Sequence, residues 1–189
     1  MFAISRPSDY VIQRFITQSQ QLALSYDQIG VAREKEPTFT HDEASAVIGH
    51  GANTFAAAKK ALDQWRQFDL GWVELFPGGA SIEKDTNVAV LIRHLGLWSL
   101  HGCRVLYHTG NREEGLLFGL AYGTLTNHAE CGEELFEVFL NRESGEVWYR
   151  IRAASKPRAM LARVGYPYTR WSQARFRRDS IAAMKRAMG

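Results

Sequence analysis

The sequence predicts an α+β fold in which a curved antiparallel sheet of about six to seven strands grips a long C-terminal helix. Three features of the chain support this prediction. Ahead of Gly71, apolar residues recur at helical spacing, whereas from Gly71 to residue 154 they alternate with a period of two. Beyond Pro157 the composition again favours a helix. A run of antiparallel strands has to bury one face, and the terminal helix is the element available to cover it.

The N-terminal part of the chain predicts two helices joined by irregular segments. Pro7-Ser8-Asp9 is a typical helix start, and an apolar face at helical spacing follows it, made of Val11, Ile12, Phe15 and Ile16. Leu22 to Val31 suggests a short strand or extended segment, and the polar stretch 32–41, which contains Pro37, suggests a loop. Ala52 to Phe68 is rich in good helix formers and predicts a helix.

Six strands are predicted in the alternating part of the chain: Trp72–Phe76, Asn87–His94, Cys103–His108, Leu116–Leu125, Glu133–Leu140 and Glu146–Ala154. The segment Asn141 to Gly145 joins the last two as a hairpin. The terminal helix is expected to break at Gly165-Tyr166-Pro167. No repeat or linker divides the chain, so residues 1–189 are expected to form a single domain. By analogy, this element order is that of helix-grip proteins, the START-like and Bet v 1-like folds.

Composition and motifs exclude several classes of protein. Hydrophobic residues make up 46% and charged residues 23%, which are ordinary globular values, and no apolar stretch is long enough to span a membrane. The phosphate-loop, dinucleotide, metalloprotease and serine-hydrolase motifs are absent, so no cofactor is expected. The first residues lack the pattern of a signal peptide, and Cys103 and Cys131 have no metal-binding spacing. We therefore expect a cytoplasmic protein with free thiols and no metal.

The net charge of +3 conceals an asymmetry along the chain. Residues 1–149 hold 12 Lys and Arg against 19 Asp and Glu, whereas residues 150–189 hold 11 against a single acid, Asp179. The basic residues of the predicted terminal helix point in several directions on a helical wheel. Pairing within the fold, for example Arg175 with Asp179, is therefore the preferred interpretation. The alternatives are anion binding by Arg170, Arg175 and Arg178 and a surface for a partner protein, and nucleic acid is not the expected partner.

A ligand pocket is predicted on the face of the strand Asn87–His94 that turns toward the core. If Val88 faces the core, alternation places His94 on the same face, where it is either a general base or ligand-orienting group, or a core histidine bonded to the backbone. Gly119, Ala121 and Gly123 leave room on one face of another strand for a ligand or, preferably, for the terminal helix. The predicted ligand-binding residues are Val90, Ile92, His94, Trp98, Tyr122 and Phe136.

A second group of candidates surrounds the predicted loop 127–132. His128 with Glu133 or Glu134 can share a proton or hold a divalent ion, and the alternative is a plain turn in which His128 bonds the backbone. The candidate catalytic residues are therefore His94, His128 and Glu133. His94, His101 and His108 recur every seven residues, a spacing that has no meaning on strands, so they predict no metal site.

Several segments resemble a known family, domain of unknown function 1990, also catalogued as uncharacterised protein family 0548. The resemblance spans roughly residues 20–187 and includes His128, Gly132-Glu-Glu134 and Phe136; its longer segments are Leu24–Gly30, Trp65–Trp72, Val88–Leu100, Phe118–Leu125, Leu161–Tyr168 and Arg175–Ser180. It assigns no catalytic or binding role to any residue.

Three functions follow as expectations. The first is binding of a small apolar or amphipathic molecule between the sheet and the C-terminal helix. The second is an enzyme on the same scaffold that uses His94 or His128 as acid or base, with Glu133 orienting it. The third is a polyanion-binding module built on the basic helix. The sequence leaves the ligand, the reaction and the oligomeric state open.

Overall fold

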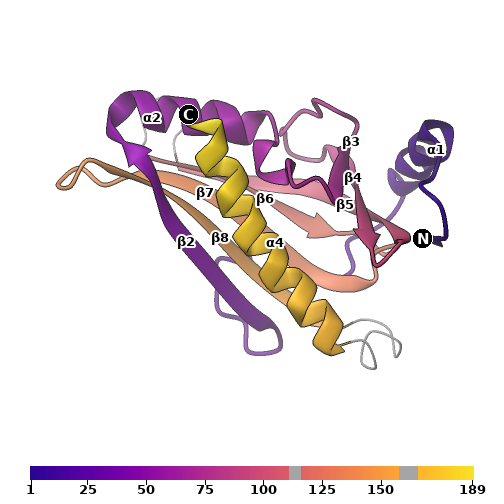
Figure 1. Ribbon diagram of the computed structural model, residues 1–189. Helices are drawn as coiled ribbons and strands as arrows, with labels where there is room; N and C mark the ends of the chain where they lie inside the picture. The colour runs from indigo at the N-terminus through magenta and orange to yellow at the C-terminus, as the bar shows by residue number, and fades with distance from the viewer. Residues whose placement is uncertain (111–115, 158–165) are drawn as a thin grey trace.

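One antiparallel sheet organises the protein, seen in a computed structural model that describes residues 1–110, 116–157 and 166–189 (Figure 1). In this part of the chain the strand order is β2-β8-β7-β6-β5-β4-β3, and the short β1 pairs with the start of β5 beyond the reach of β6. The bounds are β1 Phe2–Ala3, β2 Thr40–His50, β3 Val73–Phe76, β4 Asn87–His94, β5 Leu97–Thr109, β6 Leu117–Thr124, β7 Glu130–Leu140 and β8 Glu146–Pro157.

The two faces of the sheet bury different clusters because successive side chains of a strand point to opposite sides. On β4, Val88 and Val90 belong to the main core, whereas Ala89 and Leu91 pack in a separate cluster with the N-terminal helix. This alternation matches the pattern that predicted the strand. One face is therefore the inner face, under the C-terminal helix, and the other is the outer face.

The C-terminal helix α4 (Tyr166–Ala187) crosses the inner face diagonally, and its C-terminal end lies beside α2 (Figure 1). Phe176 and Met184 are the large apolar side chains that it buries in the main core. The buried hydroxyl groups of Ser180 on α4 and Tyr149 on β8 lie 2.8 Å apart and form a hydrogen bond. Apolar packing and this bond fix α4 over the sheet.

Helix α2 (Gly51–Asp63) covers one end of the inner face and buries Phe55, Ala58, Ala61 and Leu62. The helix predicted for Ala52–Phe68 is in fact interrupted, because Trp65 adopts a left-handed conformation with φ of 58°. A short 3-10 helix, η1 (Arg66–Phe68), follows. The indole N–H of Trp65 donates to the backbone oxygen of Ala80 at 2.9 Å, so tertiary contacts hold the break in place.

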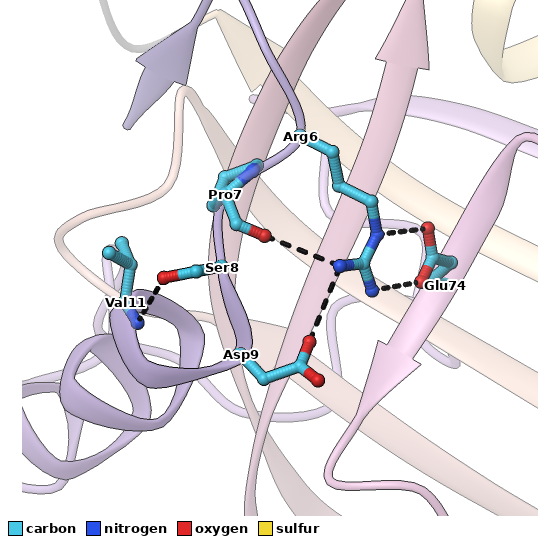
Figure 2. A network of polar contacts seen from close by, with 6 residues as sticks. All are labelled: Arg6, Pro7, Ser8, Asp9, Val11 and Glu74. Atoms are coloured by element: carbon cyan, nitrogen blue, oxygen red, sulfur yellow. Dashed lines mark hydrogen bonds and ion pairs between the residues drawn. The ribbon is translucent and has the colours of Figure 1, made fainter.

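Helix α1 (Asp9–Ser19) lies on the outer face, where Ile12 and Ile16 pack against Ala89, Leu91 and Leu100. The hydroxyl of Ser8 accepts a hydrogen bond from the backbone N–H of Val11 and caps the helix, as Figure 2 shows. The guanidinium of Arg6 forms a two-pronged pair with Glu74 of β3, with N···O distances of 3.1 and 2.7 Å.

The predicted fold class is confirmed, with corrections in detail. Strand β2 carries no clear alternation in the sequence, because it is a half-exposed edge strand that pairs only with β8. The segment Leu22–Val31 forms only an isolated bridge, between Leu24 and Leu125. Tyr166 and Pro167 of the expected helix break lie inside α4, and Gly165 lies outside the described residues.

The small residues of β6 do not contact α4, contrary to the preferred expectation. They face outward, and a Cβ atom at Gly123 would collide with the hydroxyl of Tyr26. Tyr26 and Ala121 belong to the same outer-face cluster. The small side chains therefore make room for the segment that carries Tyr26, on the face opposite to α4.

Candidate functional site

A cavity of about 580 Å³, partly open to solvent, lies between the inner face of the sheet and α4. Its size is that of a typical small-molecule site. The wall is mainly apolar: Phe68 comes from η1, Val90 and Ile92 from β4, and Phe176 from α4. Among the residues that line the cavity in the described part of the chain, none is Lys or Arg. Its polar groups come from several elements, including α4, and two hydrogen-bonded sets are centred on β4 and β5 and on β7.

The first polar set is a hydrogen-bonded chain that starts at α4 and runs into the sheet. The hydroxyl of Tyr168 lies 3.0 Å from Nδ1 of His94, and Nε2 of His94 lies 2.8 Å from the hydroxyl of Ser99. The same hydroxyl lies 2.8 Å from Nε2 of His101. Alternation on β5 places Ser99 and His101 on the inner face, next to His94 at the end of β4.

The hydrogen-bonding capacity of one serine hydroxyl orders the protons in this chain. Burial raises the pKa of Tyr168, so its hydroxyl keeps its proton beside Nδ1 of His94. Ser99 has one proton to give, so it donates to Nε2 of one of the two histidines and accepts from Nε2 of the other. Burial also lowers the pKa of His94 and, more strongly, of His101. Both histidines are accordingly neutral at pH 7.

His128 extends this set from the loop between β6 and β7. Its Nδ1 accepts a hydrogen bond from the backbone N–H of Glu130 at 3.0 Å, and its ring centre lies 4.4 Å from that of His101. The backbone bond is the turn-like arrangement that the sequence left open. His128 also lines the cavity, so its ring takes part in the same wall as His94 and His101.

The second polar set consists of two carboxyl groups on the inner face of β7. The hydroxyl of Tyr122 donates to Oε2 of Glu134, and the side-chain amide of Gln173 on α4 donates to Oε1 of Glu130 at 3.0 Å. Burial raises the pKa of Glu134 above that of a solvated carboxyl group, although Tyr122 and Arg177 oppose the shift. Burial likewise raises the pKa of Glu130 to about 7. These two groups therefore carry protons more readily than surface carboxylates do.

Glu133 points to the outer face, which corrects the hypothesis that it orients a catalytic histidine. Its carboxylate accepts hydrogen bonds from the hydroxyls of Tyr26 and Tyr107 at 2.9 and 2.6 Å. It also accepts from the backbone N–H groups of Gly30 and Ala32 at 2.9 and 3.4 Å. The side chain is 2% exposed and fixes the segment before β2 onto the sheet.

Four of the predicted ligand-binding residues line the cavity, namely Val90, Ile92, His94 and Tyr122. Trp98 does not, and its prediction is wrong: it is paired with Ala3 and Arg93, and its side chain packs in the outer-face cluster with α1. Phe136 lies behind the wall, where its ring contacts those of Phe68, Tyr122 and Phe176. It supports the lining without being part of it.

Sequence reasoning missed Ser99, Glu130 and Gln173 and dismissed His101. Alternation along the strands is the signal that could have found three of these four residues, because Ser99 and His101 share the face of Cys103, and Glu130 shares that of Glu134. Gln173 lies on α4 among residues of many kinds, and its contact with Glu130 joins positions 43 residues apart. No local pattern marks such a pair.

Four of the six basic residues of α4 contact acids of the protein. Arg170 and Arg177 contact the carboxylate of Asp42 on β2, at 2.5 and 3.3 Å. Arg175 and Arg178 contact Asp179 at 3.4 and 2.9 Å. The guanidinium of Arg175 also lies 4.2 Å from the ring centre of Trp72. This arrangement favours internal pairing over anion binding by Arg170, Arg175 and Arg178.

Residues 1–110, 116–157 and 166–189 contain no group of three or more His, Cys, Asp or Glu side chains placed to hold a metal ion. Within the same ranges, every helix is too short or too polar to cross a membrane.

The curved sheet, the helix across it and the cavity between them define a helix-grip protein of the START and Bet v 1 type. The chain belongs to the family described as Domain of unknown function (DUF1990), whose model matches residues 25–183. It is 32% identical to a UPF0548 protein of Dictyostelium discoideum, over all of this chain and 96% of that protein. It is also 32% identical to a UPF0548 protein of Arabidopsis thaliana, over 77% of this chain and 72% of that one.

Solved structures share the fold at low sequence identity. The Zhui aromatase/cyclase of a Streptomyces species superposes with a TM-score of 0.56 at 11% identity, covering 79% of this chain and 93% of that one. A hypothetical protein from Helicobacter pylori gives a TM-score of 0.56 at 8% identity, covering 88% and 96%. Human STARD10 gives 0.50 at 10% identity, covering 96% and 81%. At these identities the likeness shows the fold alone.

Proposed function

We propose that this protein binds a small apolar or amphipathic molecule in the cavity under α4. The observation that carries the proposal is the pocket itself, about 580 Å³ of space bounded mainly by apolar side chains. Close-packed proteins leave few voids larger than a water molecule between their elements. An apolar pocket of this size, partly open to solvent, is therefore a feature that a bound molecule explains.

The composition of the wall supports an amphipathic ligand over a strongly polar one. Transfer of apolar surface from water contributes about 25 cal/mol per Å² on burial, so an apolar body gains affinity throughout this cavity. The hydroxyl, imidazole and carboxyl groups of the two polar sets then orient the few polar atoms that the ligand carries.

The test uses the purified protein and Nile red, a neutral apolar dye whose emission rises in apolar surroundings. We expect saturable binding with a single site and a micromolar Kd, accompanied by release of co-purified small molecules detected by native mass spectrometry. Absence of saturable dye binding, together with native spectra that show only the bare chain, would contradict the proposal. A matched variant that fills the cavity is described in the Discussion.

A second candidate function, proton transfer on the bound molecule, is favoured by the chain Tyr168–His94–Ser99–His101. Tyr168 and Ser99 occupy both ring nitrogens of His94, so a proton taken from the ligand would reach His94 through the hydroxyl of Tyr168, which lines the cavity. The Streptomyces protein of the same fold, named an aromatase/cyclase, supports an enzyme as the alternative. If His94 acts on the ligand, its imidazole NMR signals shift when the cavity is filled; unchanged signals in the saturated protein would exclude it.

A further inference from the structure

The cavity has an excess of carboxyl groups on one side. Glu130 and Glu134 both lie on the inner face of β7, and both line the cavity. Each has one oxygen that accepts a hydrogen bond, from Gln173 and from Tyr122 respectively. Among the described residues, Oε2 of Glu130 and Oε1 of Glu134 have no hydrogen-bond partner.

The described residues at this wall carry more negative than positive charge. The arginines that act on Glu130 and Glu134, Arg170 and Arg177 on α4, both contact Asp42 of β2. With Asp42, Glu130 and Glu134 ionised, these five groups hold three negative charges against two positive ones. A carboxylate that is partly shielded from water is stabilised by a further positive charge, so this wall favours a cationic group in a ligand.

The apolar wall that faces these carboxyl groups is aromatic. Phe68, Tyr122 and Phe176 all line the cavity, and the rings of Phe68 and Tyr122 lie 6.1 Å apart. Aromatic faces attract organic cations, with an energy of about 1–2 kcal/mol when the site is shielded from water. The wall thus offers both partners that an ammonium group uses, a carboxylate and ring faces.

We propose that the cavity selects a cationic amphipathic ligand, an organic amine with an apolar body, whose ammonium group pairs with Glu134. The proposal rests on the proposed ligand-binding function and narrows it to one class of ligand. Free fatty acids and other apolar carboxylates are disfavoured, because their charge meets Glu134 and Glu130 and, in the described wall, no Lys or Arg. Glu130 strengthens the preference by adding a second negative charge on the same strand.

The electrostatics make amine binding dependent on pH. The titratable and charged groups that interact with Glu134 are Asp42 on β2, Cys103 on β5, Tyr122 on β6, Glu130 on β7, Tyr149 on β8 and Arg177 on α4. Burial raises the pKa of Glu134, so the free protein holds a larger share of this group protonated at mildly acidic pH. A primary amine stays protonated to about pH 10. Its affinity therefore rises with pH as Glu134 loses its proton.

The experiment measures displacement of Nile red by three probes with the same apolar chain: decylamine, decan-1-ol and decanoate. We expect decylamine to bind about 10-fold more tightly than decan-1-ol, and decanoate to bind more weakly than either. Between pH 5.5 and 8 the affinity for decylamine should rise, whereas that for decan-1-ol should stay constant. Glu134→Gln keeps the bond from Tyr122 and should lower the affinity for decylamine about 10-fold, with little change for decan-1-ol.

Two further variants complete the test. Glu130→Gln should lower the affinity for decylamine by a smaller factor, and the matched control Glu143→Gln, in the exposed β7–β8 hairpin, should leave it unchanged. The amine proposal would be overturned if decan-1-ol bound as tightly as decylamine or more tightly, or if Glu134→Gln lowered the affinity for all three probes equally. Either result would leave the ligand-binding function standing. Failure of every probe and of Nile red to bind would overturn both.

Discussion

Glu133 and Glu134 are consecutive residues of β7, yet their carboxyl groups lie on opposite faces of the sheet in opposite surroundings. Glu133 accepts four hydrogen bonds on the outer face, whereas Glu134 accepts one, from Tyr122, and faces the cavity. Alternation along the strand is the whole cause of this division. The first carboxylate is part of the scaffold, and the second is available to a ligand.

The change Glu133→Gln is expected to lower the free energy of unfolding by about 2–3 kcal/mol, because the new amide group faces donors and leaves buried groups unsatisfied. Ligand binding by the folded protein should be retained. Urea denaturation followed by tryptophan fluorescence measures the first effect, and Nile red titration the second. The comparison variant is Glu134→Gln, which should change stability far less. Equal destabilisation by the two changes would contradict the assignment of Glu133 to the scaffold and of Glu134 to the cavity.

The change Ser99→Ala removes the hydroxyl that His94 and His101 share. His101 is 5% exposed, so its Nε2 atom would lose its partner in a buried environment, and we expect a loss of about 1–2 kcal/mol. Free of this bond, His94 should also show altered imidazole NMR signals. Ser99→Thr keeps a hydroxyl and serves as the control. Unchanged signals of His94 in Ser99→Ala would show that the chain does not form in solution.

The main part of the fold was predictable because period-two alternation is strong wherever one face of a strand is buried. Val88, Val90 and Ile92 are an example, and their common face was assigned correctly from the sequence. Strand β2 was not predicted because its residues are mostly half-exposed at the edge of the sheet, where either face tolerates polar side chains. The position of Trp65 depends on a contact with Ala80, far along the chain, which no local pattern encodes.

The site was predictable only in part, for two physical reasons. Val90, Ile92 and His94 follow from alternation within a single strand. The contacts between strands and helix, such as Tyr168 with His94, depend on how α4 crosses the sheet and have no counterpart in local sequence. Trp98 was misplaced because alternation was not carried through the tight turn at Leu95 and Gly96, both of which have positive φ.

The change Ala153→Leu adds an isobutyl group to the wall of the cavity, on β8 opposite Glu134. We expect the affinity for Nile red to fall about 5–10-fold, since the dye and the added group compete for the same space. Stability should stay within about 1 kcal/mol of the original or increase, as cavity-filling changes commonly stabilise. Ala57→Leu on the exposed side of α2 adds the same group outside the cavity and should leave dye binding unchanged. Loss of binding in both variants would point away from this cavity.

The pair between Asp42 and Arg170 joins β2 to α4 and predicts a dependence of stability on pH. The hydrogen bonds from Arg170 hold the pKa of Asp42 below its usual range. A carboxyl group with a lowered pKa in the folded state stabilises the fold fully above its unfolded pKa of about 3.9, and the stabilisation is lost as pH falls through the folded value.

We expect Asp42→Asn to lower the free energy of unfolding at pH 7 by about 2 kcal/mol, since Arg170 and Arg177 lose their shared partner. Urea denaturation of both proteins between pH 2 and 7 should show this difference shrinking below about pH 4. Asp27→Asn, at an exposed position, is the control for charge alone. A difference that is constant over the whole range would mean that the ionised carboxylate of Asp42 contributes nothing to the junction of β2 with α4.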